Sequence, residues 1–198
     1  MRHFLALLVL LLSPTVLFAV LLHAFVGFWR RLGPAATYAA LGAIVAAGVV
    51  GVFQLREPLL AVEFGTSWPL AVLGAACLAA SAWLRFLGYR HFGNAMLAGL
   101  PELAPDRHPG RLVTEGIYAR IRHPRYLEVL LFVTGCALVS NHLVAYVVAA
   151  LAIPAIHAVV LLEERELRAR FGAAYEEYCR RVPRFLPRWR SSGRPSRA

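Results

Sequence analysis

Two apolar runs decide the fold of this chain: YLEVLLFVTGCALV at residues 126–139 and LVAYVVAALAIPAIHAVVLL at residues 143–162, joined by Ser140-Asn141-His142. The second run carries no Asp, Glu, Lys or Arg and has about the 20 residues that a helix needs to cross a bilayer. Because the joint is short, the two runs are expected to lie side by side. The pattern therefore predicts a helical hairpin in a membrane, with a shorter first arm.

The composition of the whole chain also indicates a membrane protein. Of the 198 residues, 59% are hydrophobic and only 16% are charged, which is unusual for a soluble domain. The mean hydropathy is +0.60. Further apolar runs cover residues 4–28, 35–53 and 68–87. Together with the hairpin they predict an all-α, multi-pass membrane helix bundle of about five transmembrane helices.

The first run begins like a secretory signal peptide, with Arg2 before an apolar stretch. It continues well past the 7 to 15 apolar residues of such a peptide, and no small-residue cleavage site ends it cleanly. We therefore expect a retained membrane helix. Pro14 is expected to kink this helix rather than end it, because membrane helices can absorb the freed backbone groups.

The distribution of arginine predicts an orientation, since all 21 basic residues are arginine. In a five-span arrangement most of them share one side, namely Arg30, Arg31, those in 85–125 and those from 165 onward, whereas Arg2 and Arg56 lie opposite. The positive-inside rule then puts the N-terminus outside and the C-terminus in the cytoplasm. The net charge of +10 thus needs no nucleic acid as partner. A basic face beside the membrane is instead expected to attract anionic membrane lipids.

Two other patterns indicate scaffold rather than chemistry. Cys77, Cys136 and Cys179 have neither a disulfide nor a metal-ligand spacing. Gly42 and Gly51, each four residues from an alanine, form a small-residue face on the second span. Such a face predicts close packing against another helix.

The segment before the hairpin predicts a helix start with polar character. Pro124 suits the first turn of a helix and moves His123 out of the helical region, toward the N-cap. The first N–H groups of such a helix lack intrahelical partners and attract anions, and Arg122 and Arg125 flank them. The same residues also suit an ordinary helix start at a membrane interface, so this segment alone leaves both interpretations open.

A second polar block follows the hairpin. Glu163 and Glu164 lie at the membrane boundary, where a carboxylate is costly unless it is paired or hydrated. Beyond them one apolar stripe predicts an amphipathic helix: Leu167, Phe171, Tyr175, Tyr178 and Val182. The other face offers four i,i+4 ion pairs: Glu164 with Arg168, Glu166 with Arg170, Glu176 with Arg180, and Glu177 with Arg181. We expect this cytoplasmic helix to fold back over the hairpin and roof a pocket, with the stripe in packing contacts.

These blocks together resemble a known family. The motifs are Gly116-x-Tyr118-x-x-x-Arg122-His123-Pro124-x-Tyr126, Glu163-Glu164-x-x-Leu167-x-x-x-Phe171-Gly172-x-x-Tyr175-x-x-Tyr178, and Val182-Pro183-Arg184-Phe185. In order and spacing they resemble the isoprenylcysteine carboxyl methyltransferase and phospholipid methyltransferase superfamily. The resemblance divides the chain into a scaffold of three transmembrane helices at 1–90, a methyltransferase core at 91–190 and a disordered tail at 191–198. The scaffold is expected to supply walls of the acceptor site.

The resemblance implies an integral membrane enzyme that uses S-adenosyl-L-methionine. Carried onto this chain, the cofactor-binding positions are Gly110, Arg111, Leu112, Val113, Tyr118, His123, Pro124, Arg125, Tyr126 and Glu163. Glu163 is then the expected partner of the cofactor's ammonium, and the helix start at Pro124 that of its carboxylate. Tyr118 or Tyr126 would cover the adenine or lie near the cationic sulfonium. His123 would orient the cofactor or act as a base.

Two positions depart from the family pattern. Glu128 stands where a small residue is usual, and it is expected either to form an ion pair with Arg122 or Arg125 or to reach the substrate channel as a catalytic group. The arginine that some members use for a substrate carboxylate has no counterpart at Val159. We therefore expect a lipid or other small hydrophobic acceptor, entering from the bilayer, more than a prenylcysteine. The sequence favours O- or N-methyl transfer, and whether O, N or S is methylated stays open.

Two other functions remain possible on the sequence alone. Sterol reductases share a similar C-terminal hairpin but use NADPH, and a non-catalytic relative could retain the fold. The absence of lysine suggests a GC-rich bacterial genome and hence the bacterial inner membrane. The sequence does not indicate an oligomeric state.

Overall fold

The computed structural model describes residues 1–90, 100–104, 107 and 110–187. Within these residues the chain is helical, and the only extended pairing is one antiparallel bridge between Glu63 and His142. The elements are α1 (Arg2–Ala24), α2 (Val26–Leu32), α3 (Pro34–Gln54), α4 (Arg56–Leu60), α5 (Trp68–Tyr89), α7 (Leu100–Leu103), η1 (Gly116–Ala119), α8 (Pro124–Ser140), α9 (Leu143–Phe171) and α10 (Ala173–Arg181).

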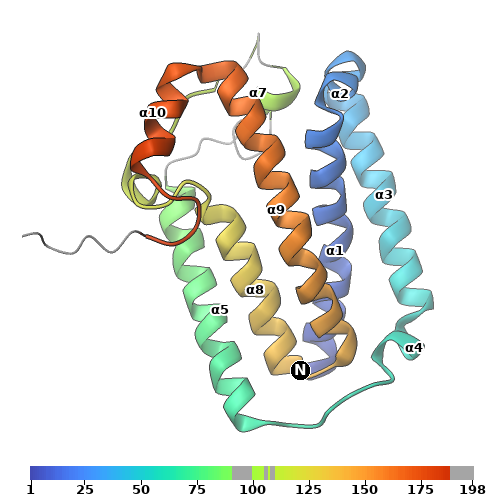
Figure 1. Ribbon diagram of the computed structural model, residues 1–198. Helices are drawn as coiled ribbons and strands as arrows, with labels where there is room; N and C mark the ends of the chain where they lie inside the picture. Colours follow the sequence, from blue (N-terminus) through green and yellow to red (C-terminus); the bar gives the residue numbers. More distant parts are fainter. Residues whose placement is uncertain (91–99, 105–106, 108–109, 188–198) are drawn as a thin grey trace, which may run out of the picture.

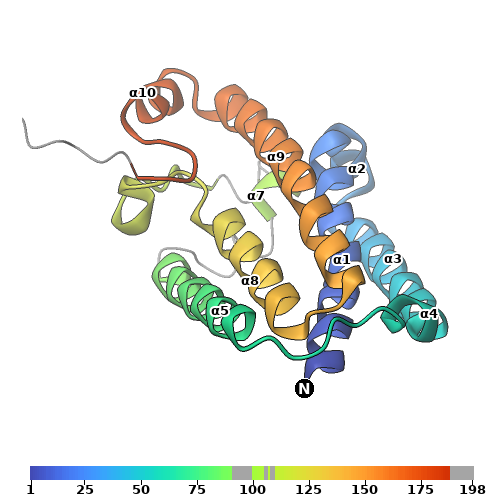
Figure 2. The same cartoon turned by 60° about the horizontal axis from the view of Figure 1, so that its bottom comes forward.

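The long helices form one bundle with α8 and α9 near its middle (Figure 1). α8 packs against α5 on one side and against α9 and α1 on the other. α3 lies at the outside of the bundle and packs against α1, as the tilted view also shows (Figure 2). α7, η1 and α10 cover the end of the bundle opposite the N-terminus. The predicted helical hairpin is α8 and α9, which turn at Asn141 with a left-handed φ of 53°.

Four of the described helices are long and apolar enough to span a membrane: Arg2–Ala24, Pro34–Gln54, Trp68–Gly88 and Leu143–Phe171. They match four of the five predicted spans. The fifth, the short hairpin arm, is the 17-residue helix α8. Pro14 lies inside α1, which continues through it as expected. The first span was predicted too long, because α1 ends at Ala24 and a separate short helix follows.

The close helix packing is not where the small-residue pattern predicted it. A Cβ added at Gly42 or Gly51 would meet nothing within 4 Å, so neither glycine lies at a close helix contact. Instead, Gly74 of α5 meets Gly135 of α8, where an added Cβ would lie 2.8 Å from the opposing carbonyl oxygen in either direction. Absence of side chains lets these two backbones touch, which explains the extensive α5–α8 contact.

The predicted amphipathic helix is also different in the structure. α9 runs 29 residues, about 43 Å at the helical rise, and so exceeds a hydrocarbon core of about 30 Å. The chain then turns at Gly172, whose φ of 51° and ψ of −126° suit glycine and end the helix. The stripe is therefore divided between α9 and α10, although Tyr175, Tyr178 and Val182 still form one buried cluster. The tail predicted at 191–198 lies outside the described residues.

Candidate functional site

The start of α8 is built as the proline predicted. Pro124 occupies the first turn and His123 is the N-cap residue, with φ −122° and ψ 57° outside the helical region. The preceding backbone is held by the C-terminal segment, because the N–H groups of Arg122 and His123 donate to the carbonyl oxygens of Pro183 and Arg184 at 2.9 and 3.0 Å. The end of the described chain thus positions the beginning of α8.

Glu164 forms the centre of a buried charge cluster beside this helix start. Its side chain is fully buried, and Arg184 binds both carboxylate oxygens, at 3.0 and 2.8 Å. Arg122 donates to it at 2.8 Å and His123, through Nε2, at 3.2 Å. The hydrogen bond to Glu164 raises the pKa of Arg184. Arg122 and Arg184 therefore neutralise the buried Glu164 carboxylate. The sequence indicated that this carboxylate needs a partner but did not identify one.

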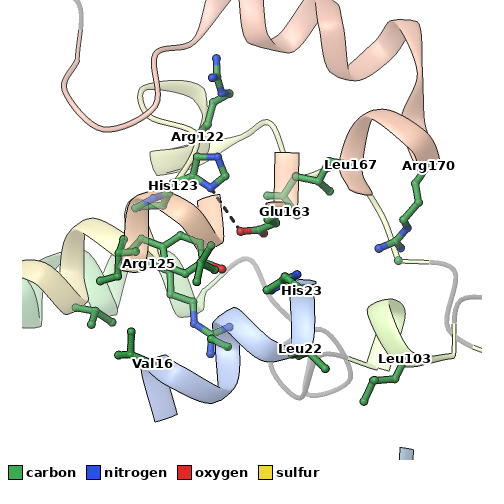
Figure 3. A pocket seen from close by; sticks show the side chains of 18 of the residues that line it. Val16, Leu22, His23, Leu103, Arg122, His123, Arg125, Glu163, Leu167 and Arg170 are labelled. Atoms are coloured by element: carbon green, nitrogen blue, oxygen red, sulfur yellow. Dashed lines mark ion pairs between the residues drawn. The ribbon is translucent and has the colours of Figure 1, made fainter. Parts of the chain in front are cut away.

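Glu163, the neighbouring carboxylate, has a different environment. Its Oε2 atom lies 3.7 Å from Nδ1 of His123, and this oxygen is buried without a hydrogen-bond partner. Figure 3 shows the Glu163 carboxylate facing the imidazole of His123. Because the ionised Glu164 only accepts hydrogen bonds, Nε2 of His123 carries a hydrogen. In the neutral ring, Nδ1 is then an acceptor directed toward Glu163.

A cavity of about 510 Å³ joins this polar site to the membrane helices. All ten cofactor-binding residues that the resemblance implied line it: Gly110, Arg111, Leu112, Val113, Tyr118, His123, Pro124, Arg125, Tyr126 and Glu163. Its other walls come from apolar positions of α1 and α3, such as Val16 and Leu41, and from Val159 of α9. One cavity therefore has a polar end and an apolar end.

Two tyrosines close the polar end. The hydroxyl group of Tyr178, on α10, donates to the backbone carbonyl of Tyr118 at 2.7 Å, and both side chains are buried. Burial raises the pKa of Tyr178, and burial together with the charge of Glu163 raises that of Tyr118. Both phenols are therefore neutral at physiological pH. Tyr178, predicted as a packing residue, has this further positioning contact.

Glu128 forms the expected ion pair, but with a different partner. Its carboxylate accepts from Arg85 of α5 at 2.6 Å and from Ser81 at 3.2 Å, not from Arg122 or Arg125 as predicted. The α5–α8 packing brings Arg85 to Glu128 across 43 positions of sequence, which spacing alone could not show. Glu128 is not among the described residues that line the cavity. A catalytic role for Glu128 stays a prediction.

The amphipathic segment likewise exchanges one predicted partner, because Arg180 pairs with Glu177 rather than with the predicted Glu176. Glu164 with Arg168 and Glu177 with Arg181 are present as i,i+4 pairs, at 3.5 and 3.4 Å. Arg168, however, also reaches Glu176 of α10 at 2.8 Å, across the turn at Gly172. The break between the helices makes this longer connection possible.

Sequence reasoning missed His23 as a cavity residue. It lies in the last turn of α1, lines the cavity, and contacts Glu166 of α9 through Nδ1 at 2.9 Å. A single histidine near the end of an apolar run was the one available signal. That signal does not distinguish a packing residue from a site residue.

The fold and the cavity define a multi-pass membrane helix bundle with a polar pocket at one end. A family model for phospholipid methyltransferases matches residues 70–174, just over half of the chain. The chain belongs to the phospholipid methyltransferase family. This confirms the resemblance noted in the sequence.

Individual relatives include named methyltransferases. The chain is 45% identical to methanethiol S-methyltransferase 2 of Bradyrhizobium diazoefficiens, over 36% of this chain and 27% of that protein. It is 32% identical to the protein-S-isoprenylcysteine O-methyltransferase of Schizosaccharomyces pombe, over 38% and 33%. It is 39% identical to a cobalt-zinc-cadmium resistance protein of Cupriavidus metallidurans, over 41% and 38%. The chain thus spans roughly a third of the length of these relatives. No solved structure matches.

Proposed function

We propose that this protein transfers a methyl group from S-adenosyl-L-methionine to a small hydrophobic acceptor in the membrane. The observation that carries the proposal is Glu163, whose Oε2 atom is buried and without a hydrogen-bond partner on the wall of the cavity. A buried carboxylate oxygen of this kind calls for a cationic partner. The ammonium group of the cofactor's methionine moiety meets that requirement.

The other walls fit the remaining parts of the cofactor. The helix start at Pro124, with Arg125 beside it, offers unpaired N–H groups and positive charge to a carboxylate. Tyr118 and Tyr126 offer aromatic faces for the adenine or for a cationic sulfonium. The segment 110–113 closes the same end of the cavity. Each part of the cofactor thus has a candidate partner among the residues that line the cavity.

When bound, the cofactor supplies an electrophilic methyl group, and the chain's own residues align and shield the reaction. Displacement at a methyl carbon needs the acceptor in line with the leaving group and water kept out. His123 is buried between Glu163 and Glu164, so its ring is fixed in place and can help to orient the bound cofactor. If the acceptor is an amine or a thiol, Nδ1 of His123 is the group that would take its proton.

The acceptor side is the apolar end of the cavity. Side chains of α1 and α3 form it, and α3 packs at the outside of the bundle, so a hydrophobic molecule can approach from the bilayer. Val159 lies in this wall and offers no charge for a carboxylate substrate. The relatives' names specify a sulfur acceptor in one case and an oxygen acceptor in another. We therefore propose a small uncharged or lipid acceptor without assigning the methylated atom.

The proposed location is the bacterial inner membrane, with the N-terminus outside and the polar end of the cavity on the cytoplasmic side. The arginines support this orientation, because Arg111, Arg122, Arg125 and Arg170 all line that end. The cofactor would enter from the cytoplasm and the acceptor from the lipid. Anionic lipid headgroups are the expected partners of this basic face.

Titration calorimetry of the detergent-purified protein with S-adenosylhomocysteine tests the proposal. Wild type is expected to bind saturably, with Glu163→Gln about ten- to a hundredfold weaker, as loss of a charged hydrogen bond predicts. His123→Ala should also weaken binding. Glu57→Gln is the matched control, since Glu57 is exposed on α4 at the other end of the bundle.

A parallel titration with NADPH separates the methyltransferase from a reductase of the sterol-reductase type. Binding of NADPH in place of S-adenosylhomocysteine would reverse the assignment. Failure of a folded, monodisperse sample to bind either molecule would favour a non-catalytic protein that retains the fold.

A further inference from the structure

We propose that a divalent transition-metal ion of the zinc type binds at the end of the bundle that carries the N-terminus, far from the cavity. The site consists of His3, Glu63 and His142, hereafter the His-Glu-His cluster. One ligand atom from each lies within 4.8 Å of the other two. The three residues come from α1, from the linker between α4 and α5, and from the α8–α9 turn. Figure 1 shows this linker passing below the N-terminus and the start of α9.

The backbone holds two of the three residues side by side. Glu63 and His142 form the antiparallel bridge, with the Phe64 N–H donating to the carbonyl of Asn141 and the Leu143 N–H donating to that of Val62, both at 3.0 Å. Paired residues in such a bridge have neighbouring side chains. The separation of Glu63 and His142 is therefore set by hydrogen bonds rather than by flexible side chains.

His142 has the geometry of a metal-ligating histidine. Its side chain is fully buried, and Nδ1 lies 2.8 Å from the carbonyl oxygen of Ser140. A carbonyl only accepts, so Nδ1 carries the hydrogen and the neutral ring presents a lone pair at Nε2. Nε2 is buried without a hydrogen-bond partner and faces Oε2 of Glu63 at 3.8 Å. A backbone carbonyl behind the ring is the usual outer contact of a metal-ligating histidine.

His3 completes the cluster from the exposed side. Its Nε2 lies 3.8 Å from the same oxygen of Glu63, and its ring meets that of His142 edge to face at 4.8 Å between centroids. Arg2 fixes the first turn of α1 here, donating to the carbonyls of Ser140 and Gly65 at 3.1 and 2.6 Å. The third ligand is thereby kept near the other two.

Arg2 also decides which kind of cation the cluster would take. Its Nη1 atom lies 2.7 Å from Oε1 of Glu63, which neutralises the carboxylate and leaves Oε2 to the two imidazoles. With little net negative charge, the site does not suit Ca²⁺ or Mg²⁺, which require several oxygen ligands. Two imidazole nitrogens and one carboxylate oxygen suit Zn²⁺ and its neighbours in the transition series.

The dimensions agree with such an ion. Tetrahedral ligands at the usual bond lengths of about 2.0 to 2.2 Å stand roughly 3.3 to 3.6 Å apart, close to the 3.8 Å that separates Oε2 of Glu63 from Nε2 of each histidine. Three protein ligands leave a fourth position, and the side chain of His3 is 64% exposed, so water can reach it. A bound ion would cross-link α1, the linker between α4 and α5, and the α8–α9 turn.

Zinc binding by the purified protein tests the proposal. The detergent-solubilised chain is stripped with a chelator, titrated with Zn²⁺ by calorimetry, desalted and assayed for zinc by mass spectrometry. Wild type is expected to retain one zinc ion per chain. His3→Ala and Glu63→Gln should each weaken binding by at least about tenfold. His157→Ala is the matched control, because His157 is exposed on α9 away from the cluster, and it should bind as wild type does.

His3→Ala is the decisive variant, because the exposed His3 side chain contributes little to folding; its elution profile and Tm without metal should equal those of wild type. Co²⁺ in place of Zn²⁺ should give the visible absorption of a tetrahedral site in wild type and lose it in His3→Ala. Absence of stoichiometric zinc in wild type, or equal zinc in wild type and His3→Ala, would overturn the proposal. The cluster would then be a packing contact among the two histidines and Glu63.

Discussion

At the scale of single residues, the adjacent carboxylates Glu163 and Glu164 on α9 have different environments. One residue along a helix turns a side chain by about 100°, so Glu164 points into the cluster with Arg122 and Arg184 while Glu163 points to the cavity. Glu164 is fully satisfied and fully buried. Glu163 keeps one buried oxygen without a hydrogen-bond partner. The first arrangement stabilises the site, and the second leaves it capable of binding a cation.

Removing the charge of Glu164 should destabilise the protein strongly. Glu164→Gln leaves Arg122, Arg184 and His123 without their common carboxylate, and breaking a buried ion pair in this way costs about 3 to 5 kcal/mol. At this chain length 3 kcal/mol corresponds to a fall in Tm of roughly 6 to 12 °C, measured by thermal unfolding in detergent. Glu177→Gln, which changes an exposed carboxylate on α10, is the control and should leave Tm unchanged. Equal Tm values for the two variants would contradict a structural role for the Glu164 cluster.

At the scale of elements, the site depends on how closely α5 approaches α8. The meeting of Gly74 and Gly135 brings the two backbones together, and the same contact sets Arg85 opposite Glu128. α8 in turn carries His123 and Pro124 at its beginning. A change in the α5–α8 distance is therefore transmitted to the start of α8 and to the cavity.

Adding a methyl group at this contact should separate the helices. In Gly135→Ala the new Cβ would lie 2.8 Å from the carbonyl oxygen of Gly74, which cannot move without its helix, so we expect a loss of about 1 to 3 kcal/mol. Gly42→Ala has nothing within 4 Å and should be neutral or slightly stabilising. Thermal unfolding of the two variants beside wild type measures the difference. A Gly135→Ala variant as stable as Gly42→Ala would mean that α5 and α8 are not in backbone contact.

At the scale of the whole molecule, the two ends of the bundle differ in chemistry. The end with α10 has arginines, buried carboxylates and the cavity, whereas the end with the N-terminus has the His-Glu-His cluster (Figure 1). The distribution of arginine predicts that the first end faces the cytoplasm. The proposed metal site would then face the opposite compartment, where an ion from outside can reach it.

Cysteine labelling in intact cells tests this orientation. After replacement of Cys77, Cys136 and Cys179 by serine, single cysteines are introduced as Glu57→Cys on α4 and Glu177→Cys on α10, both at exposed side chains. A membrane-impermeant maleimide should label position 57 in intact spheroplasts and position 177 only after permeabilisation. Each site serves as the other's control, and the reverse pattern would mean that the chain is inserted the other way.

The sequence by itself determined the positions of the long apolar helices and the point at which α8 begins. Apolar runs of membrane length and a proline at position 124 act through local properties of the chain, so they need no knowledge of neighbours. The family motifs also grouped the ten residues from Gly110 to Glu163 that the structure brings to one cavity. Ordered motifs carry this information because the site is built from segments close to the two ends of one hairpin.

Only the tertiary structure decided which distant residues meet. Arg85 rather than Arg122 pairs with Glu128, Gly74 rather than Gly42 makes the close contact, and His3 contacts His142 across 139 positions of sequence. Each of these contacts depends on which faces of separate helices pack together. Which faces pack together depends on the shape of whole interfaces, including where a glycine lacks a side chain or where a carboxylate meets an arginine. The spacing of residues along one helix does not contain this information.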